Sequence, residues 1–345
     1  MEKETDRLVN RRMGWSCTFG ILVALAFTSA GLPLLSYGAG PEVTLRSAGD
    51  LPIGNHLTRA QEYFAKQVTE ISKGRVLVEV FPAGQLFAAK DYPKAVPSGA
   101  VDMAQCWAAQ WTGLVPTISV LDLFFFYDDW QHFWRTLDSE AGEILLQEME
   151  KAGVRPLYWI QDGTSGFATK APLKKLDDFK GKRIRSGTEL GSHAIKALGG
   201  APAFMGGGEV YMALQRGTVD GAVSSVTSFR DRKYFEVTKH VTEPGTFFPP
   251  YLCVMNLKKW NGLSPDHQKI LLEAGKDAQA WARKEVLKES QESIQDLKKH
   301  GMEVYYLPKE EKELWKKACK PVDNIVISKT GDVGRKLLAL AEKVR

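Results

Sequence analysis

The stretch that decides the fold runs from residue 182 to residue 223 and reads KRIRSGTELGSHAIKALGGAPAFMGGGEVYMALQRGTVDGAV. It opens with a strand pattern at Lys182–Arg185 and continues with a helical segment, Leu190–Leu198, that a glycine pair ends. A second helix is predicted over Glu209–Arg216, and a second strand over Val219–Val223. Strands and helices in alternation are typical of parallel sheets covered by helices.

The same alternation extends through the rest of the chain. Ser264 and Pro265 predict the start of a long helix that runs toward Lys299. Phe124–Phe126 is too apolar for a surface loop, so we expect it to pack inward. Further helices are predicted at Leu57–Ser72 and Asp91–Pro97, and further strands at Glu42–Ser47, Val76–Phe81, Ala100–Gln105, Arg155–Ile160, Phe167–Thr169, Leu252–Leu257 and Glu303–Leu307.

Two similar sets of strands and helices, linked more than once, predict an α/β fold with a ligand cleft between two lobes. We expect the long helix to span both lobes. The first lobe is assigned to residues 41–162 plus 251–290, and the second to residues 163–250 plus 291–345. Ligands of open α/β sheets bind beyond the carboxyl ends of the strands, so the functional residues are sought there.

The first forty residues have the order of a secretory signal peptide. Arg7, Arg11 and Arg12 precede the apolar run Phe19–Phe27, and small residues follow. We expect cleavage after Gly38 and export to the periplasm by the general pathway; the alternative is an uncleaved N-terminal anchor. No later stretch reaches the roughly 18 consecutive apolar residues that a spanning helix needs, so no stable membrane insertion is expected after cleavage.

The charge of the chain argues against a nucleic-acid-binding protein, and its few cysteines bear on burial and disulfides. Of 345 residues, 46 are Lys or Arg and 41 are Asp or Glu, which gives a formal net charge of +5. The charges are scattered and form no long block of one sign, so no nucleic-acid partner is expected. Cys106, Cys253 and Cys319 follow the predicted signal; Cys106 and Cys253 have apolar neighbours that predict burial, and one disulfide is left open.

The sequence lacks the motifs of several common enzyme classes. It has no Gly-x-Ser-x-Gly elbow, no His-Glu-x-x-His pair and no Gly-Lys-Ser/Thr phosphate loop. The six histidines are dispersed and do not stand at metal-ligand spacing. We therefore predict binding without catalysis, with no catalytic residues, no cofactor and no resident metal.

Arg185 is the candidate anchor for a ligand. It ends a predicted strand and precedes a glycine-containing loop and a helix, so its side chain is expected to point into the cleft. A guanidinium presents a rigid fork of N–H donors that matches a carboxylate through two parallel hydrogen bonds. The alternative is an ordinary salt bridge to a neighbouring acid.

These residues, with other segments of the chain, resemble the solute-binding proteins of TRAP (tripartite ATP-independent periplasmic) transporters, of the dicarboxylate-binding-protein-like family. The resemblance covers nearly the whole mature chain. It implies a two-lobed periplasmic solute-binding protein fold in which Arg185 grips the substrate carboxylate. The segments that carry it are Val80-Phe-Pro-Ala-Gly-Gln-Leu86, Gly99-Ala-Val-Asp-Met-Ala104, Asp177-Asp-Phe-Lys-Gly181, Glu209-Val-Tyr-Met-Ala-Leu-Gln215 and Val219-Asp-Gly221.

Departures from the family pattern bear on the ligand. Ser165 stands where sialic-acid-type members carry a second arginine, and Ser224 stands where they carry an asparagine. Trp107 stands where some members have a polar or acidic contact. These changes favour a monocarboxylate with an apolar or aromatic body over a sugar acid with many hydroxyls. Trp159 and Phe248 are further candidates for the ligand site, and Trp111 and Phe247 are weighed beside them as cleft or core residues.

The resemblance implies a solute receptor that binds a small organic acid and delivers it to a two-component membrane permease, the TRAP permease subunits. That permease would be driven by an ion gradient and not by ATP. The main alternative is a ligand-sensing receptor for a signalling kinase that uses the same site. An exported enzyme is the remote third reading, which formation of a product from the bound ligand would establish.

Overall fold

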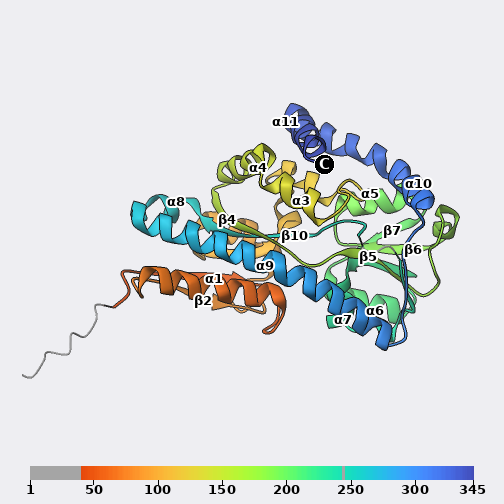
Figure 1. Ribbon diagram of the computed structural model, residues 1–345, viewed down its shortest axis with the longest axis horizontal. Helices are drawn as coiled ribbons and strands as arrows, with labels where there is room; N and C mark the ends of the chain where they lie inside the picture. The colour runs from red at the N-terminus through yellow and green to blue at the C-terminus, as the bar shows by residue number, and fades with distance from the viewer. Residues whose placement is uncertain (1–39, 243–244) are drawn as a thin grey trace, which may run out of the picture. The chain divides into compact units, whose positions relative to one another are not determined.

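The computed structural model describes residues 40–242 and 245–345, so the predicted signal peptide lies outside the described residues. Within this part of the chain, two β-sheets carry the architecture (Figure 1). In the first sheet, β1 (Val43–Gly49) lies between β2 (Val76–Phe81) and β3 (Met103–Trp107), and β10 (Pro250–Asn256) lies between β3 and β4 (Val154–Gln161).

The second sheet is built almost entirely from the middle of the chain. Its β6 and β8 pair in parallel, as do β6 and β7. Its strands lie in the order β11 (Glu303–Tyr305), β9 (His240–Thr242), β5 (Ser165–Thr169), β8 (Gly221–Ser225), β6 (Arg183–Ser186) and β7 (Ala201–Phe204).

The prediction of parallel sheets is wrong for one strand in each sheet. In the first sheet, β10 is antiparallel to both of its neighbours, β3 and β4. In the second sheet, β5 is antiparallel to β8 and β9. The chain passes directly from β4 into β5 and from β9 back into β10, so these strands enter their sheets from the other one. The two sheets are therefore linked by short connections between strands in addition to helices.

Helices cover the sheets, and the five that the sequence predicts begin and end within about one residue of the predicted bounds. α5 (Glu189–Ala197) is followed by Gly199 at a φ of +95°, the left-handed conformation that the glycine pair predicts. The structure adds helices that the sequence pattern did not reveal, among them α3 and α4. The remaining helices are α1 (His56–Ser72), α2 (Tyr92–Ser98), α3 (Trp130–Leu137), α4 (Glu140–Lys151), α6 (Val210–Gln215), α7 (Val226–Asp231), α8 (Leu257–Asn261), α9 (Pro265–Lys299), α10 (Lys309–Cys319) and α11 (Asp323–Lys343).

The long helix α9 runs past both sheets (Figure 1). The Ser264 hydroxyl accepts a hydrogen bond from the His267 amide and caps its start, as predicted. Its first half packs on α1 and β4, and its second half on α7 and β11. The close approach to β4 depends on Gly275, because a Cβ there would lie 2.9 Å from the Leu157 carbonyl oxygen.

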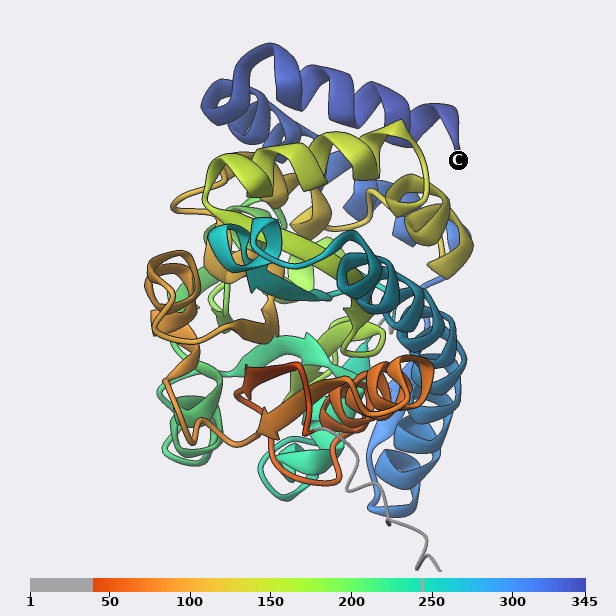
Figure 2. The ribbon, with the colours of Figure 1, turned by 90° about the vertical axis from the view of Figure 1, so that its left-hand side faces the viewer.

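Glu289 of α9 joins the two halves of the structure by ion pairs. Its carboxylate accepts from Arg59 of α1 at 2.6 Å and from Arg230 of α7 at 2.9 Å. The Glu289 side chain is only 8% exposed, so both pairs are partly shielded from water. Figure 2 shows α1 lying alongside α9, where the first of these pairs forms.

The carboxyl-terminal segment packs differently from the predicted lobe assignment. Trp315 of α10 lies in an apolar cluster with Phe167 and Phe179 of the second-sheet region. Helix α11, by contrast, packs with α3 and α4 over the first sheet. The structure therefore differs from an assignment of all of residues 291–345 to the second lobe. Phe124–Phe126 is buried, which confirms the expectation from its composition.

The three cysteines of the described residues are buried and free. Cys106 and Cys253 lie on the adjacent strands β3 and β10 but face different apolar clusters. Among the residues that the structure places, no helix combines the length and the apolar character needed to cross a membrane.

Candidate functional site

A cleft of about 840 Å³ opens where the carboxyl ends of strands from both sheets meet. Asp50, directly after β1, and Trp107, at the end of β3, line it from the first sheet. Arg185 of β6 and Ser224 of β8 line it from the second sheet. This is the place at which α/β sheets generally bind ligands, and it is where the sequence predicted the site.

Arg185 lies in the wall of the cleft with its guanidinium held by backbone carbonyls. Nε and Nη2 donate to the Met205 oxygen at 3.1 and 2.9 Å, and Nη1 donates to the Val223 oxygen at 3.1 Å. A guanidinium has five N–H groups, so one remains on each terminal nitrogen. The side chain is buried, and burial lowers the pKa of Arg185 to about 10.

The alternative interpretation of Arg185, a salt bridge to a neighbouring acid, is wrong for the described residues. None of their carboxylates forms an ion pair with this guanidinium. Glu209 and Tyr234 favour its charged form only through space. A buried cation whose partners are carbonyl oxygens still lacks a counter-charge, and its two remaining N–H groups are donors that a carboxylate can satisfy.

Trp107 and Arg185 meet at Gly187, the first residue after β6. A Cβ on Gly187 would lie 2.7 Å from Nη2 of Arg185 and 3.1 Å from the Cζ3 and Cη2 atoms of Trp107. The indole ring and the guanidinium are therefore neighbours across this glycine. The Trp107 Nε1 atom is buried and has no hydrogen-bond partner among the described residues.

The two predicted serines are placed differently with respect to the cleft. Ser224 lines it and is half-buried. Ser165 pairs with Ser225 across the antiparallel β5–β8 ladder, but it is fully buried and does not line the cleft. Ser225 takes that place, and its hydroxyl donates to Asp162 at 2.9 Å.

Trp159 and Phe248 also lie away from the cleft, in the apolar core. Trp159 lies two residues before the end of β4, and its side chain is buried in the apolar core. Its backbone amide donates a hydrogen bond to Gln279 of α9. Phe248 packs on Trp130, with ring centroids 4.6 Å apart. Of the pair weighed beside them, Trp111 is fully buried in the same core, whereas Phe247 lines the cleft.

Three aspartates in the cleft wall were not anticipated from the sequence. Burial raises the pKa of Asp50 to about 6 and that of Asp122 to about 7, and it also raises the pKa of Asp162. Asp162 directly follows β4, and Asp50 directly follows β1, so both are strand-end residues. That position was the available signal, but the predicted strands end at Ser47 and Ile160, two residues and one residue before the ends of β1 and β4.

Arg232 is a second cation in the cleft that the sequence did not single out. It follows α7, is exposed, and has no ion pair within the described ranges. Its terminal nitrogen lies close to Gly207, where a Cβ would come within 2.7 Å of it. No local pattern distinguishes Arg232 from the other surface arginines, so only the fold could reveal it.

The family model for bacterial extracellular solute-binding proteins, family 7, matches residues 51–329 of this chain. The chain is 30% identical to the C4-dicarboxylate-binding periplasmic protein DctP of Rhodobacter capsulatus, over 82% of this chain and 85% of that protein. It is 29% identical to the 2,3-diketo-L-gulonate-binding periplasmic protein YiaO of Escherichia coli, over 84% of this chain and 87% of that protein. The chain belongs to solute-binding protein family 7.

Solved structures of the same class share the fold. A TRAP periplasmic solute-binding protein from Roseobacter denitrificans, with bound β-D-glucuronate, matches with a TM-score of 0.81 at 28% identity, over 87% of this chain and 99% of that one. One from Sulfurospirillum deleyianum, with bound succinate, matches with a TM-score of 0.79 at 27% identity, over 88% of this chain and all of that one. The predicted resemblance to TRAP receptors is confirmed: this protein is a solute-binding receptor and not an enzyme.

A substitution at Gly187 tests the geometry of this receptor's cleft. We expect Gly187→Ala to weaken ligand binding roughly tenfold, because the added methyl group must displace the Arg185 guanidinium or the Trp107 ring. Calorimetric titration with a carboxylate ligand measures the change. Gly113→Ala is the matched control, because Gly113 also lines the cleft but has open space around its Cβ position. Equal affinities of the two variants would contradict the placement of Gly187.

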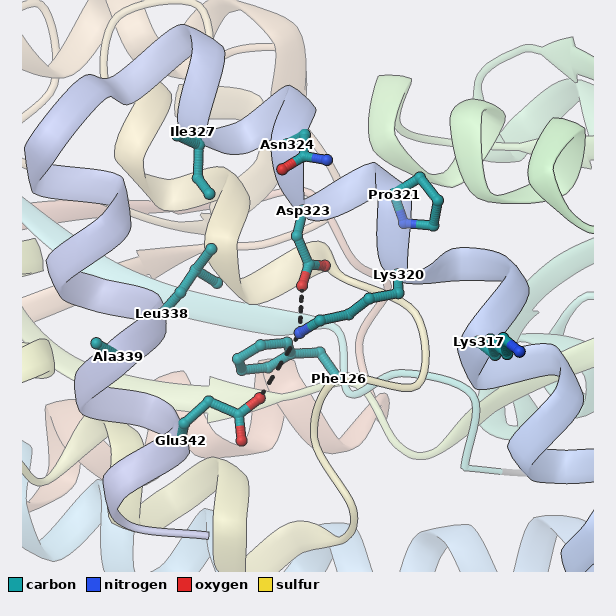
Figure 3. Close-up of a pocket in the computed structure, with 10 residues that line it drawn as sticks. All are labelled: Phe126, Lys317, Lys320, Pro321, Asp323, Asn324, Ile327, Leu338, Ala339 and Glu342. Carbon is teal, nitrogen blue, oxygen red and sulfur yellow. Dashed lines mark ion pairs between the residues drawn. The ribbon is translucent and has the colours of Figure 1, made fainter.

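A second, smaller hollow of about 540 Å³ lies between α10 and α11 of the receptor (Figure 3). Lys320 crosses it and pairs with Asp323 at 2.8 Å and with Glu342 at 3.9 Å. The same ammonium lies over the Phe126 ring, 5.6 Å from its centroid. Because these charges pair with one another, the hollow presents no buried cation comparable with Arg185.

Proposed function

We propose that this receptor binds a small organic acid with a single carboxylate held by Arg185 and delivers it to the membrane permease subunits of a TRAP transporter. The apolar or aromatic face of the ligand packs against Trp107, and Ser224 provides a polar contact beside them. The observation that carries the proposal is the buried guanidinium in the cleft wall, which has carbonyl partners but no carboxylate partner among the described residues.

The ligands of related structures support a carboxylate. The Roseobacter denitrificans protein holds β-D-glucuronate, and the Sulfurospirillum deleyianum protein holds succinate. Both molecules carry a carboxylate, which is the group that a buried arginine fork recognises best. The proteins named above are described as solute-binding proteins, which supports delivery to a permease over the alternative of a receptor that signals to a kinase.

A thermal-shift screen over organic acids tests the proposal, because a ligand that binds only the folded state raises the apparent unfolding temperature. The acids should include aliphatic and aromatic monocarboxylates, dicarboxylates, and uncharged amides of the same acids. We expect monocarboxylates to raise the unfolding temperature and their amides to have no effect. A screen in which the amides stabilise the protein as strongly as the acids would overturn the carboxylate assignment.

Trp107→Ala separates the packing contribution from the charge contribution. We expect a loss of roughly tenfold or more in affinity for a flat aromatic acid such as benzoate, and a smaller loss for acetate, because the variant removes ring contact but no charge. Trp107→Phe is the matched control and should recover most of the affinity for benzoate. Calorimetry on both variants measures the effect. An equal loss for benzoate and acetate would contradict a stacking role.

A further inference from the structure

Two carboxylates, Asp50 and Asp162, line the cleft from the first sheet, whereas the Arg185 guanidinium lines it from the second. Asp50 lines the cleft, and no other side chain in the described part of the chain donates a hydrogen bond to its carboxylate. One of its oxygens, Oδ1, is buried without a partner among the described residues, although a hydrogen bond from the Asp50 backbone favours the ionised carboxylate and lowers its pKa. A buried carboxylate oxygen without a donor is costly, so it favours a ligand that supplies one.

Asp162 also lines the cleft, at the end of β4, which β3 and β10 separate from β1 and Asp50. The Ser225 hydroxyl donates to its Oδ2 at 2.9 Å, and the Thr227 hydroxyl donates to its Oδ1 at 3.1 Å. Hydroxyl donors favour the ionised form of a carboxylate and oppose the effect of burial on its pKa. Asp162 also raises the pKa of Asp50 through space.

Arg232 also lines the cleft. Its charge lowers the pKa of Asp50 and Asp162, and it also lowers the pKa of Arg185. It is exposed and forms no ion pair with any described carboxylate, so it offsets the two aspartates only in part. Of the two lysines in the cleft wall, Lys329 pairs with Glu189 and Lys90 is exposed, so no described cation forms an ion pair with Asp50 or Asp162.

Asp122 and Gln110 add two further unpaired acceptor oxygens to the cleft wall. Both line the cleft, and both carry a buried side-chain oxygen without a partner among the residues that the structure places. Asp122 is only 2% exposed. These two oxygens, like Oδ1 of Asp50, are acceptors that a donor on the ligand can satisfy.

Resting on the proposed function, we infer that the ligand is a monocarboxylate whose far end, away from the carboxylate held by Arg185, carries a hydrogen-bond donor, a hydroxyl or an ammonium group, that binds Asp50. A second carboxylate at that end would meet like charges in a partly desolvated site, so dicarboxylates are excluded. A methyl group there leaves the buried Asp50 oxygen unpaired, which is also unfavourable.

Two series of probes that differ only at the far end test the inference. One is 4-(hydroxymethyl)benzoate, 4-methylbenzoate and terephthalate; the other is 6-hydroxyhexanoate, hexanoate and adipate. In the wild-type protein at pH 8, we expect the hydroxy acid of a series to bind at least tenfold more tightly than the diacid. In Asp50→Asn, the hydroxy acid should lose affinity and the diacid should gain it, so that the ratio falls at least tenfold.

Asp332→Asn is the matched control, because Asp332 is 98% exposed and its substitution removes the same charge without touching the cleft. Circular dichroism and thermal unfolding of each variant establish that it is folded. An unchanged ratio in Asp50→Asn, or a diacid that binds as tightly as the hydroxy acid, would overturn the inference. A diacid preference that disappears in Arg232→Gln would assign the far end to Arg232 instead.

The same titrations distinguish failure of the inference from failure of the proposed function. If the acids bind the wild-type protein but not Arg185→Ala, and Asp50→Asn leaves their ratio unchanged, the carboxylate anchor holds and only the inference fails. If the acids bind equally well to the wild-type protein and Arg185→Ala, the proposed function fails. If no acid of either series binds the wild-type protein at saturating concentration, both fail.

Discussion

Arg185→Ala should weaken binding of a carboxylate ligand at least about a hundredfold. A hydrogen bond to a charged group contributes roughly 1.5–3 kcal/mol, and an end-on pair makes two such bonds. Removal of the fork also leaves the ligand carboxylate desolvated beside the Met205 and Val223 carbonyl oxygens, which repel it. Calorimetric titration of the variant with a monocarboxylate measures the loss.

Two further variants make this result specific. Arg185→Lys should recover little, because an ammonium cannot present two parallel donors. Arg183→Ala is the matched control: Arg183 lies on the same strand but is exposed and donates to the Gly217 oxygen, outside the cleft. Near-wild-type affinity in Arg185→Ala would show that the carboxylate lies elsewhere in the cleft.

Asp122→Asn should stabilise the ligand-free protein more at high pH than at low pH. Burial raises the pKa of Asp122 from 3.8 to about 7, so the folded state favours the protonated carboxyl. As the pH rises from about 4 to 7, the carboxyl group loses its proton in the unfolded chain but keeps it in the folded protein. The free energy of unfolding of the wild-type protein therefore falls over this range, whereas that of Asp122→Asn has no such contribution. The advantage of the variant should therefore grow by about 2 kcal/mol between pH 5 and pH 8.

Urea unfolding of the wild-type protein and the variant at pH 5 and pH 8 gives the two differences in free energy. Asp332→Asn, at an exposed position, should show nearly the same difference at both pH values. The comparison with the wild-type protein is needed because Asp50, Asp162 and Asp323 also have raised pKa values and titrate in both proteins. An Asp122→Asn advantage that is independent of pH would contradict the buried, unpaired carboxyl.

Local patterns were enough to predict most of the strands and helices. The strand at Val76–Phe81 and the helix after Ser264 appear where alternation and capping place them. Whether a strand is parallel or antiparallel to its neighbours could not be predicted in this way. The pattern of residues along β10 is the same for either direction of the neighbouring strands. Only the pairing of residues far apart in the chain decides that direction, as between Cys253 and Gln105.

The site could be predicted where it depends on position in a strand. Arg185 was singled out because it stands near the end of a strand, one residue before its last residue Ser186, and precedes a glycine-containing loop. Trp159 was mistaken for a cleft residue because its distance from the strand end depends on where β4 stops, and β4 continues to Gln161. Asp50 and Arg232 enter the cleft through the juxtaposition of two sheets, which no pattern along the chain encodes.

The place of β10 inside the first sheet has a consequence for the way the chain assembles. β10 separates β3 from β4, although both of them precede it by the whole second-sheet segment from β5 to β9. A chain that is still being synthesised or exported, and of which only β1 to β4 are free to fold, lacks the strand that joins β3 to β4. Contacts between segments so far apart in the sequence form late in folding. The part of this receptor that carries β1 to β4 therefore lacks a complete first sheet until the chain has been released as far as Asn256, the end of β10. A chain whose sheet is incomplete passes through a narrow membrane channel more easily than a folded one.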